Sequence, residues 1–200
     1  MIINAGKNQE FKKLLNNVEL TMPDGVGVKI ALKLKGKNIE QIRGIDFSSK
    51  LIEIADKNGY RVAFLGTKDE ILQKAVQNIK EKHQNLNIVF VHDGFFKNEE
   101  KIIEDLKKAN PQILFSALGS PKQEYFNEKI KNILDNCASI GVGGSFDVWA
   151  GYVEEAPVIW RKMGLEWLYR TLKQPERFRR IFPTLPIFLF KSIMDIRRKQ

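Results

Sequence analysis

Glycine turns that could hold an anion follow three short apolar stretches of the chain. They lie at Gly66, Gly119 and Gly143–Gly144. After Gly119, Ser120 suits an N-cap and Pro121 suits the first helical position, so free backbone N–H groups and the positive end of a helix dipole would point beyond the strand. A phosphate is favoured at such a place. Many such turns bind nothing, so a phosphate site and a purely structural turn both stay open.

Asp24 is a carboxylate that could act as a general base, taking a proton from an attacking hydroxyl. It stands between Pro23 and Gly25, at the start of a helix expected through Ile30 and Leu34. Aspartate is among the preferred N-cap residues. From position alone, capping of this helix is the favoured interpretation and catalysis is the alternative.

Metal and nucleotide signatures are missing from the sequence. A Walker A motif is absent, and Phe146 occupies the last glycine position of a GxGxxG fingerprint that would begin at Gly141. His83, His92 and the single Cys137 are isolated, which predicts surface or packing histidines and a structural thiol. No Asp-x-Asp pattern could hold a divalent cation on a diphosphate. We therefore expect no metal and no other cofactor, and expect basic groups and backbone N–H groups to meet any diphosphate.

Strands that alternate with helices must position these residues. We expect strands at Arg61–Leu65, Asn87–Val91, Ile113–Phe115 and Ala138–Val142, of which the first and third are expected to be buried. Apolar strands joined by amphipathic helices predict an α/β fold with a Rossmann-like, doubly wound, mostly parallel sheet. The glycine turns would line the edge at which such sheets bind ligands. Two more strands are expected at Met1–Ala5, which looks like the end of a strand, and at Val18–Met22.

The charge of the chain is concentrated in its last forty residues. The 200 residues are 43% hydrophobic, enough for one sizeable core. From Arg161 to Gln200, eleven Lys or Arg residues face three acidic residues, which gives +8 of the net charge of +9. We predict two domains: an α/β domain at 1–156, and a basic, amphipathic helical appendage for membrane association at 157–200.

Anionic lipid and nucleic acid are the two partners that the basic tail suggests. The apolar stretch Ile181–Phe190 is too short to cross a hydrocarbon core of about 30 Å. Its phenylalanines and the nearby arginines suit the headgroup region of a membrane. A C-terminal helix packed on the core, with a solvated basic face, is the structural alternative.

Several motifs in series resemble one enzyme family. They are Pro23–Gly27, Arg43–Asp46, Leu65–Gly66, Ala117–Glu124, Gly141–Asp147 and Gly164–Arg170. In order and spacing they resemble the WecG/TagA/CpsF glycosyltransferases over essentially the whole chain. Such enzymes transfer N-acetylmannosamine or a related sugar from a UDP-sugar to an undecaprenyl-diphosphate-linked acceptor. The resemblance implies a role in building teichoic acid linkage units, enterobacterial common antigen or capsule.

The resemblance also implies that 1–156 is the nucleotide-sugar-binding catalytic domain. It makes Asp24 the base of an inverting, metal-independent transfer, which reverses the preference for capping. Arg170, Arg177 and Arg180 are the candidates for stabilising the negative charge that grows on the leaving UDP, a role for tail arginines that the resemblance also implies. Contact with lipid alone is the alternative for each arginine.

Residues that bind substrate are expected in the same motifs. Asn4 resembles the asparagine of a Thr-x-Asn-Ala-Glu segment in the family, although Ile2 and Gly6 replace the threonine and the glutamate. Arg43 either contacts substrate or forms a surface ion pair with Asp46. Gln123 and Asp147 suit hydrogen bonds with sugar, ribose or base, and the glycines allow close backbone approach. The full set is Asn4, Arg43, Gly66, Gly119, Gln123, Gly143, Gly144 and Asp147.

The expected protein is a cytoplasmic enzyme, peripheral on the inner face of the cell membrane. Its expected partners are a UDP-sugar, a polyprenyl-diphosphate-linked acceptor carrying N-acetylglucosamine (GlcNAc), and an anionic membrane surface, without nucleic acid. Whether the protein forms a homo-oligomer is left open by the sequence. Family members normally carry a further N-terminal segment, so one alternative is a shortened, catalytically impaired member that acts as an envelope scaffold. The other alternative is a nucleic-acid-binding module that uses the basic tail.

Overall fold

The chain forms two compact units. The computed structural model describes residues 1–163, 165–173, 186–188, 190, 192 and 194, and the side chains at 162, 167 and 170 are outside this description. Unit 1 comprises Met1–Glu19 and Ile45–Glu154, and unit 2 comprises Leu20–Gly44 and Glu155–Gln200. The functional division at residues 156 and 157 stays a prediction.

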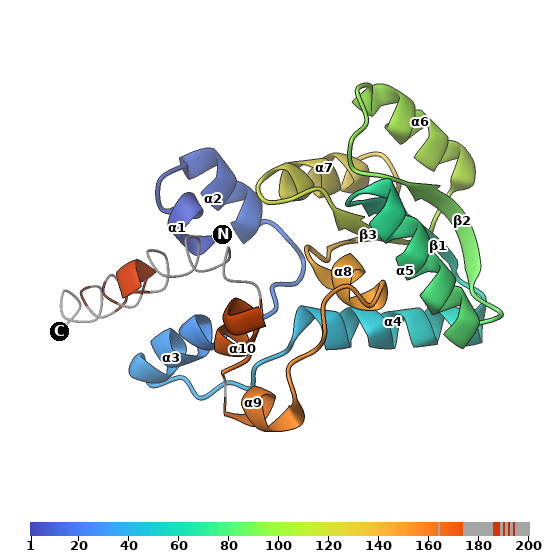
Figure 1. Cartoon of the computed structure of the whole chain (residues 1–200). Coiled ribbons are helices and arrows are strands. Elements are labelled where there is room, and N and C mark those ends of the chain that lie inside the picture. Colours follow the sequence, from blue (N-terminus) through green and yellow to red (C-terminus); the bar gives the residue numbers. More distant parts are fainter. Residues whose placement is uncertain (164, 174–185, 189, 191, 193, 195–200) are drawn as a thin grey trace. The chain divides into compact units, whose positions relative to one another are not determined.

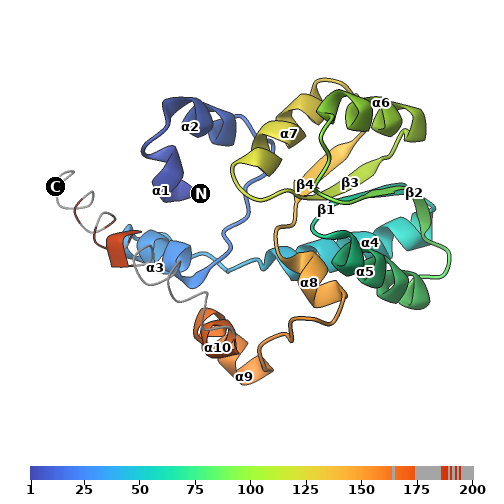
Figure 2. The same ribbon diagram turned by 45° about the horizontal axis from the view of Figure 1, so that its top comes forward.

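Unit 1 is built on a parallel sheet, which confirms the predicted α/β, Rossmann-like fold. Its strands are β1 (Arg61–Gly66), β2 (Asn87–His92), β3 (Ile113–Ala117) and β4 (Ala138–Gly141). In the described residues their order is β2-β1-β3-β4, and every neighbouring pair is parallel (Figure 2). The central strands β1 and β3 are almost wholly buried, as their unbroken apolar runs predicted.

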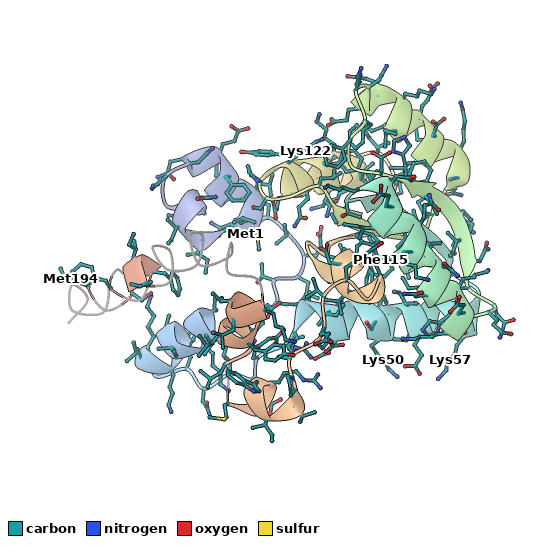
Figure 3. All side chains as sticks on the ribbon, in the orientation of Figure 1. Met1, Lys50, Lys57, Phe115, Lys122 and Met194 are labelled. Atoms are coloured by element: carbon teal, nitrogen blue, oxygen red, sulfur yellow. The ribbon has the colours of Figure 1, made fainter. Side chains whose placement is uncertain are left out.

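Helices cover both faces of the sheet (Figure 1). One face carries α4 (Gly44–Asn58), α5 (Asp69–Lys82) and α8 (Ser145–Trp149), and the other carries α6 (Glu99–Ala109) and α7 (Lys122–Lys131). Successive side chains of β1 point to opposite faces of the sheet. Val62 and Phe64 pack in the core under α4, α5 and α8, whereas Ala63 and Leu65 pack in the core under α6 and α7. Phe115, labelled in Figure 3, stacks on Phe64 with ring centroids 5.5 Å apart.

The two strands predicted at Met1–Ala5 and Val18–Met22 are wrong, because the first segment is helical and the second is irregular. Helix α1 (Ile2–Ala5) is followed by α2 (Gln9–Asn16), and the stretch Val18–Met22 contains no strand. Periodicity cannot separate strand from helix in so short an apolar run. Here the backbone bonds locally, with the Ala5 N–H donating to the Met1 carbonyl at 3.0 Å. Helix α1 packs on α2, and α2 packs on α7.

Unit 2 contains α3 (Val26–Leu34), α9 (Val158–Lys162) and α10 (Glu166–Lys173). Trp160 and Tyr169 join α9 to α10, with ring centroids 5.7 Å apart. Val158 and Ile159 of α9 are exposed. In the part of the chain that the structure describes, no helix has both the length and the hydropathy that a membrane span requires.

Candidate active site

The predicted site residues divide between the two units. Unit 1 holds Asn4, Gly66, Gly119, Gln123, Gly143, Gly144 and Asp147. Unit 2 holds Asp24, Arg43 and Arg170. Arg170 belongs to α10, but its side chain is outside the described part of the structure, and Arg177 and Arg180 lie outside the described residues altogether.

At Gly66, the backbone at the carboxyl end of β1 lies directly against the backbone of β3. Gly66 is paired with Ala117 of β3, has φ +132°, and a Cβ there would lie 2.5 Å from the Ala117 carbonyl oxygen. The Ala117 carbonyl accepts from the Thr67 N–H at 3.0 Å, and the Thr67 carbonyl accepts from the Gly94 N–H at 2.9 Å. The ends of β1, β2 and β3 are thereby joined through backbone atoms. This packing accounts for glycine at position 66.

The turns at Gly119 and Gly143 have space around them. Both residues are exposed, with φ of +78° and +50°, and no atom lies within 4 Å of a Cβ built on either one. These glycines are therefore required by backbone conformation, and they leave room for close approach by a ligand. The prediction that Ser120 is the N-cap of the following helix is wrong.

Helix α7 begins at Lys122, labelled in Figure 3. Its N-cap is Pro121, with no side-chain cap hydrogen bond. The backbone satisfies the first turn without a Ser120 cap, because the Gln123 N–H donates to the Gly119 carbonyl at 2.9 Å.

Gln123 lies over the carboxyl end of β4. Its side chain is buried, and a Cβ on Gly141 would lie 2.6 Å from its Nε2 atom. That Nε2 donates to Oε1 of Glu124 at 3.0 Å. Gln123 Oε1 and Glu124 Oε2 are buried without a hydrogen-bond partner in the described structure. Two acceptor oxygens at the sheet edge are thus unsatisfied.

Asp147 lies in the first turn of α8, beside the exposed Gly144. A Cβ on Gly144 would be 3.6 Å from Asp147 Oδ2. The Asp147 main-chain carbonyl accepts from the N–H groups of Tyr152 and Val153 at 3.0 and 3.1 Å, which fixes the backbone around the carboxylate. Sequence reasoning correctly placed Asp147 at a helix start that follows the last strand.

Asn4 is exposed on α1, and its main-chain carbonyl accepts from the N–H groups of Lys7 and Asn8 at 3.0 Å each. Phe11 of α2 contacts Tyr125 of α7, with ring centroids 5.9 Å apart. Helix α1, which carries Asn4, packs on α2, and α2 is thus anchored to α7, the helix that carries Gln123.

Asp24 caps a helix, but a different one from that predicted. Helix α3 has Gly25 as its N-cap and no side-chain cap hydrogen bond. Instead, Asp24 Oδ2 accepts from the backbone N–H of Gly44, the first residue of α4, at 3.0 Å. Its Oδ1 accepts a longer bond of 3.4 Å from the Gln41 side chain. The exposed carboxylate is thus oriented through one oxygen while the other is held only weakly.

Arg43 is the centre of an ion-pair network within unit 2. Its Nε donates to Glu166 Oε2 at 3.0 Å, and its Nη2 donates to Glu155 Oε2 at 2.9 Å. Arg161 Nη1 also donates to Glu155 Oε2, at 3.2 Å. The Arg43 and Glu166 side chains are only 12% and 19% exposed. The structure therefore gives Arg43 a clear role in holding α10 to the segment that precedes α4, whereas its contact with substrate stays a prediction.

Cys137 and His92 are packing residues, as predicted. Burial raises the pKa of the Cys137 thiol to about 11, which disfavours the nucleophilic thiolate at neutral pH. The His92 ring stacks on Phe90 and meets Phe96 edge-on. In the described residues, no group of three or more His, Cys, Asp or Glu side chains is arranged to hold a metal ion.

Three residues that contribute to these sites, Gly94, Glu124 and Gln41, were not predicted from the sequence. Gly94 follows β2, and the Asp-Gly step after an apolar run could have marked it as a fourth glycine turn. Glu124 was part of a recognised motif but received no role, although an acidic residue in a first helical turn is a visible signal. Gln41 has no local pattern that would reveal its contact with Asp24.

Comparison with known proteins identifies the family. The family model described as "Glycosyl transferase WecG/TagA/CpsF family" matches residues 1–200. A relative from Bacillus spizizenii is 33% identical over 178 residues, which cover 88% of this chain and 69% of the relative. That relative is named N-acetylglucosaminyldiphosphoundecaprenol N-acetyl-beta-D-mannosaminyltransferase. The chain belongs to the WecG/TagA/CpsF family of glycosyltransferases.

Proposed function

We propose that this glycosyltransferase moves N-acetylmannosamine, or a related hexosamine, from a UDP-sugar to GlcNAc-diphosphoundecaprenol during cell-envelope polysaccharide synthesis. The observation that carries the proposal is the Bacillus spizizenii relative, whose name states mannosaminyl transfer to that acceptor. Membership of a glycosyltransferase family over the whole chain favours neither the envelope scaffold nor the nucleic-acid-binding module.

Asp24 is the proposed general base. Its Oδ2 is occupied by the Gly44 N–H, whereas Oδ1 has only the 3.4 Å contact with Gln41 and retains lone pairs for a proton. The acceptor hydroxyl would give its proton to Asp24 as its oxygen bonds to the anomeric carbon. The bond from that carbon to UDP breaks on the opposite side, and UDP keeps the electron pair. The configuration at the anomeric carbon is therefore inverted.

Arginines are the proposed stabilisers of the departing diphosphate, in a reaction without a divalent metal. The support is the net charge of +8 after Pro157 together with the absence of an Asp-x-Asp pattern in the sequence. Arg170, Arg177 and Arg180 are the candidates. The open turns at Gly119 and Gly143, with Gln123 and Asp147 nearby in sequence, are the proposed place of the UDP-sugar.

Peripheral binding to the inner face of the cell membrane is the proposed location. An undecaprenyl chain is buried in the bilayer, so its diphosphate is accessible only at headgroup level. Val158 and Ile159 are exposed beside the basic Arg161, a combination that suits an anionic interface. Each Lys or Arg near such a surface contributes about 1 kcal/mol.

Release of UDP with a short-chain, soluble GlcNAc-diphosphoprenol acceptor tests the reaction. We expect turnover that survives EDTA and falls about 10²- to 10⁴-fold in Asp24→Asn. Asp69→Asn, on the exposed first turn of α5, is the matched control and should retain full activity. Full activity in Asp24→Asn would remove this residue from the mechanism, and loss of turnover in EDTA that Mg²⁺ restores would contradict the metal-free reaction.

Single arginine substitutions test the charge-stabilising role more sharply than truncation. A chain cut after Pro157 would also lose Glu166, which binds Arg43. We expect Arg177→Ala and Arg180→Ala to lower turnover of the short-chain acceptor, which needs no membrane, while UDP binding persists. Unchanged turnover of that acceptor, with weaker binding to anionic vesicles, would assign these arginines to the membrane alone.

A further inference from the structure

Two neighbouring side chains in the first turn of α7 control each other's orientation. Gln123 Nε2 donates to Glu124 Oε1 at 3.0 Å. The opposite orientation of the amide would bring its oxygen against a carboxylate oxygen, and neither atom can donate. Glu124 therefore fixes the orientation of the Gln123 amide, with the NH₂ group toward Glu124 and the oxygen Oε1 away from it.

The acceptor end of this amide has no donor. Gln123 is only 8% exposed, and its Oε1 has no hydrogen-bond partner in the described part of the chain. Leaving a buried polar group unpaired costs about 1 to 3 kcal/mol. The side chain lies against Gly141, whose own backbone is exposed, so the amide is just beneath the surface of the sheet edge. A ligand group that donates there would remove this cost.

The position of the amide is fixed by its surroundings. The Gln123 N–H is bonded to the Gly119 carbonyl at 2.9 Å. Farther along α7, Asn127 Oδ1 accepts from the buried Ser116 hydroxyl of β3 at 2.8 Å. Only glycine at 141 leaves space for Nε2 of Gln123. Helix and side chain are thus held against the ends of β3 and β4.

We propose that Glu124 is a positioning residue that makes Gln123 a hydrogen-bond acceptor toward the donor substrate. The ligand group is a hydroxyl or an N–H of the UDP-sugar, on the nucleotide or on the sugar. The identity of this ligand rests on the proposed function. Glu124 itself acts through Gln123 and needs no contact with the substrate.

Calorimetric titration of the full chain with UDP and with UDP-N-acetylmannosamine tests the proposal. We expect Glu124→Ala to weaken binding about tenfold, because the Gln123 amide can then turn its NH₂ group toward the ligand. The double exchange of Gln123→Glu with Glu124→Gln should restore binding. In that variant the amide at 124 donates to a carboxylate at 123 that offers only acceptors, and the net charge is unchanged. Glu128→Ala, on the same helix, is the control, and thermal unfolding of each variant reports its fold.

The affinities of wild type and variants for the two ligands distinguish the possible outcomes. Weaker binding of both ligands places the donating group on the nucleotide, whereas weaker binding of the UDP-sugar alone places it on the sugar. Unchanged affinity in folded Glu124→Ala overturns the proposal, as does an exchange variant that folds but binds as weakly as Glu124→Ala. A wild-type chain that binds UDP without turnover contradicts the proposed function and leaves this inference standing. A wild-type chain that binds neither ligand overturns both.

Discussion

Asp24 Oδ2 accepts a hydrogen bond from the backbone N–H of Gly44 at 3.0 Å, twenty residues farther along the chain. The bond ties the Pro-Asp-Gly segment to the first residue of α4. A cap and a general base are therefore compatible roles for one carboxylate, because each uses a different oxygen. The predicted cap of α3 is not formed, and the observed cap of α4 is compatible with the general-base role proposed for Asp24.

Substitutions at Asp24 should separate these two roles. Asparagine keeps an oxygen that can accept from Gly44, so Asp24→Asn should retain stability within about 0.5 kcal/mol. Asp24→Ala removes the cap and should cost about 1 kcal/mol. Both variants should lose turnover. Chemical denaturation measures the stability of each variant, and UDP release measures its turnover. Equal destabilisation by the two substitutions would show that Asp24 stabilises through its charge.

Gly66 and Gly119 should respond differently to alanine. Gly66→Ala forces a Cβ to within 2.5 Å of the Ala117 carbonyl oxygen, so β1 and β3 must separate at their ends. We expect a loss of at least about 2 kcal/mol. In Gly119→Ala the added Cβ has no atom within 4 Å. The positive φ alone should then lower the free energy of unfolding by about 1 kcal/mol. Chemical denaturation of both variants checks the order, and a Gly66→Ala chain as stable as Gly119→Ala would contradict it.

The central strands β1 and β3 could be predicted from sequence because they are buried on both faces. Such strands must be apolar at every position, as Val62–Leu65 and Ile113–Phe115 are, and this signal is strong over a few residues. Met1–Ala5 is also a short apolar run, although Asn4 interrupts it, and it is a helix. Its structure depends on packing against α2, which no local pattern contains.

The site was predictable only where backbone conformation dictates the residue. Glycines at 119 and 143 are visible in sequence because their positive φ favours glycine. The Glu124 contact with Gln123 depends on two rotamers, and the Arg43 contact with Glu166 joins residues 123 positions apart. The family motifs could therefore name Gln123 and Arg43, but they could not name the partners, because one contact depends on rotamers and the other on the tertiary fold.

Arg43 should couple energetically to Glu166. Arg43→Ala removes charge-assisted hydrogen bonds to two carboxylates, and we expect a loss of about 1 to 3 kcal/mol. Arg43→Lys should recover only part of it, because an ammonium group lacks the planar fork of a guanidinium group. A double-mutant cycle with Glu166→Ala measures the coupling by chemical denaturation. Strictly additive effects would show that the ion pair contributes nothing.

The same variants separate structure from substrate binding at Arg43. If Arg43 only holds unit 2 together, Arg43→Ala and Glu166→Ala should change the affinity for UDP equally. If Arg43 also contacts the donor, Arg43→Ala should bind UDP more weakly than Glu166→Ala does. Calorimetric titration with UDP decides between these roles.

Cys137 should make stability depend on pH in the alkaline range. Burial raises the pKa of its thiol from 9.0 to about 11 in the folded chain. Below about pH 9 the thiol is protonated in both folded and unfolded chains. Between about pH 9 and pH 11 the unfolded chain releases this proton while the folded chain keeps it, so the unfolded state gains stability and the free energy of unfolding falls.

The comparison with Cys137→Ala isolates this contribution, because every other titratable group is present in both proteins. We expect the difference in unfolding free energy between wild type and Cys137→Ala to be constant below about pH 9. It should then shift against the wild type as pH rises toward about 11, the folded pKa. Urea denaturation at a series of pH values measures the difference. A difference that stays flat through this window would mean that the folded thiol ionises as readily as the unfolded one, and therefore that Cys137 is open to solvent.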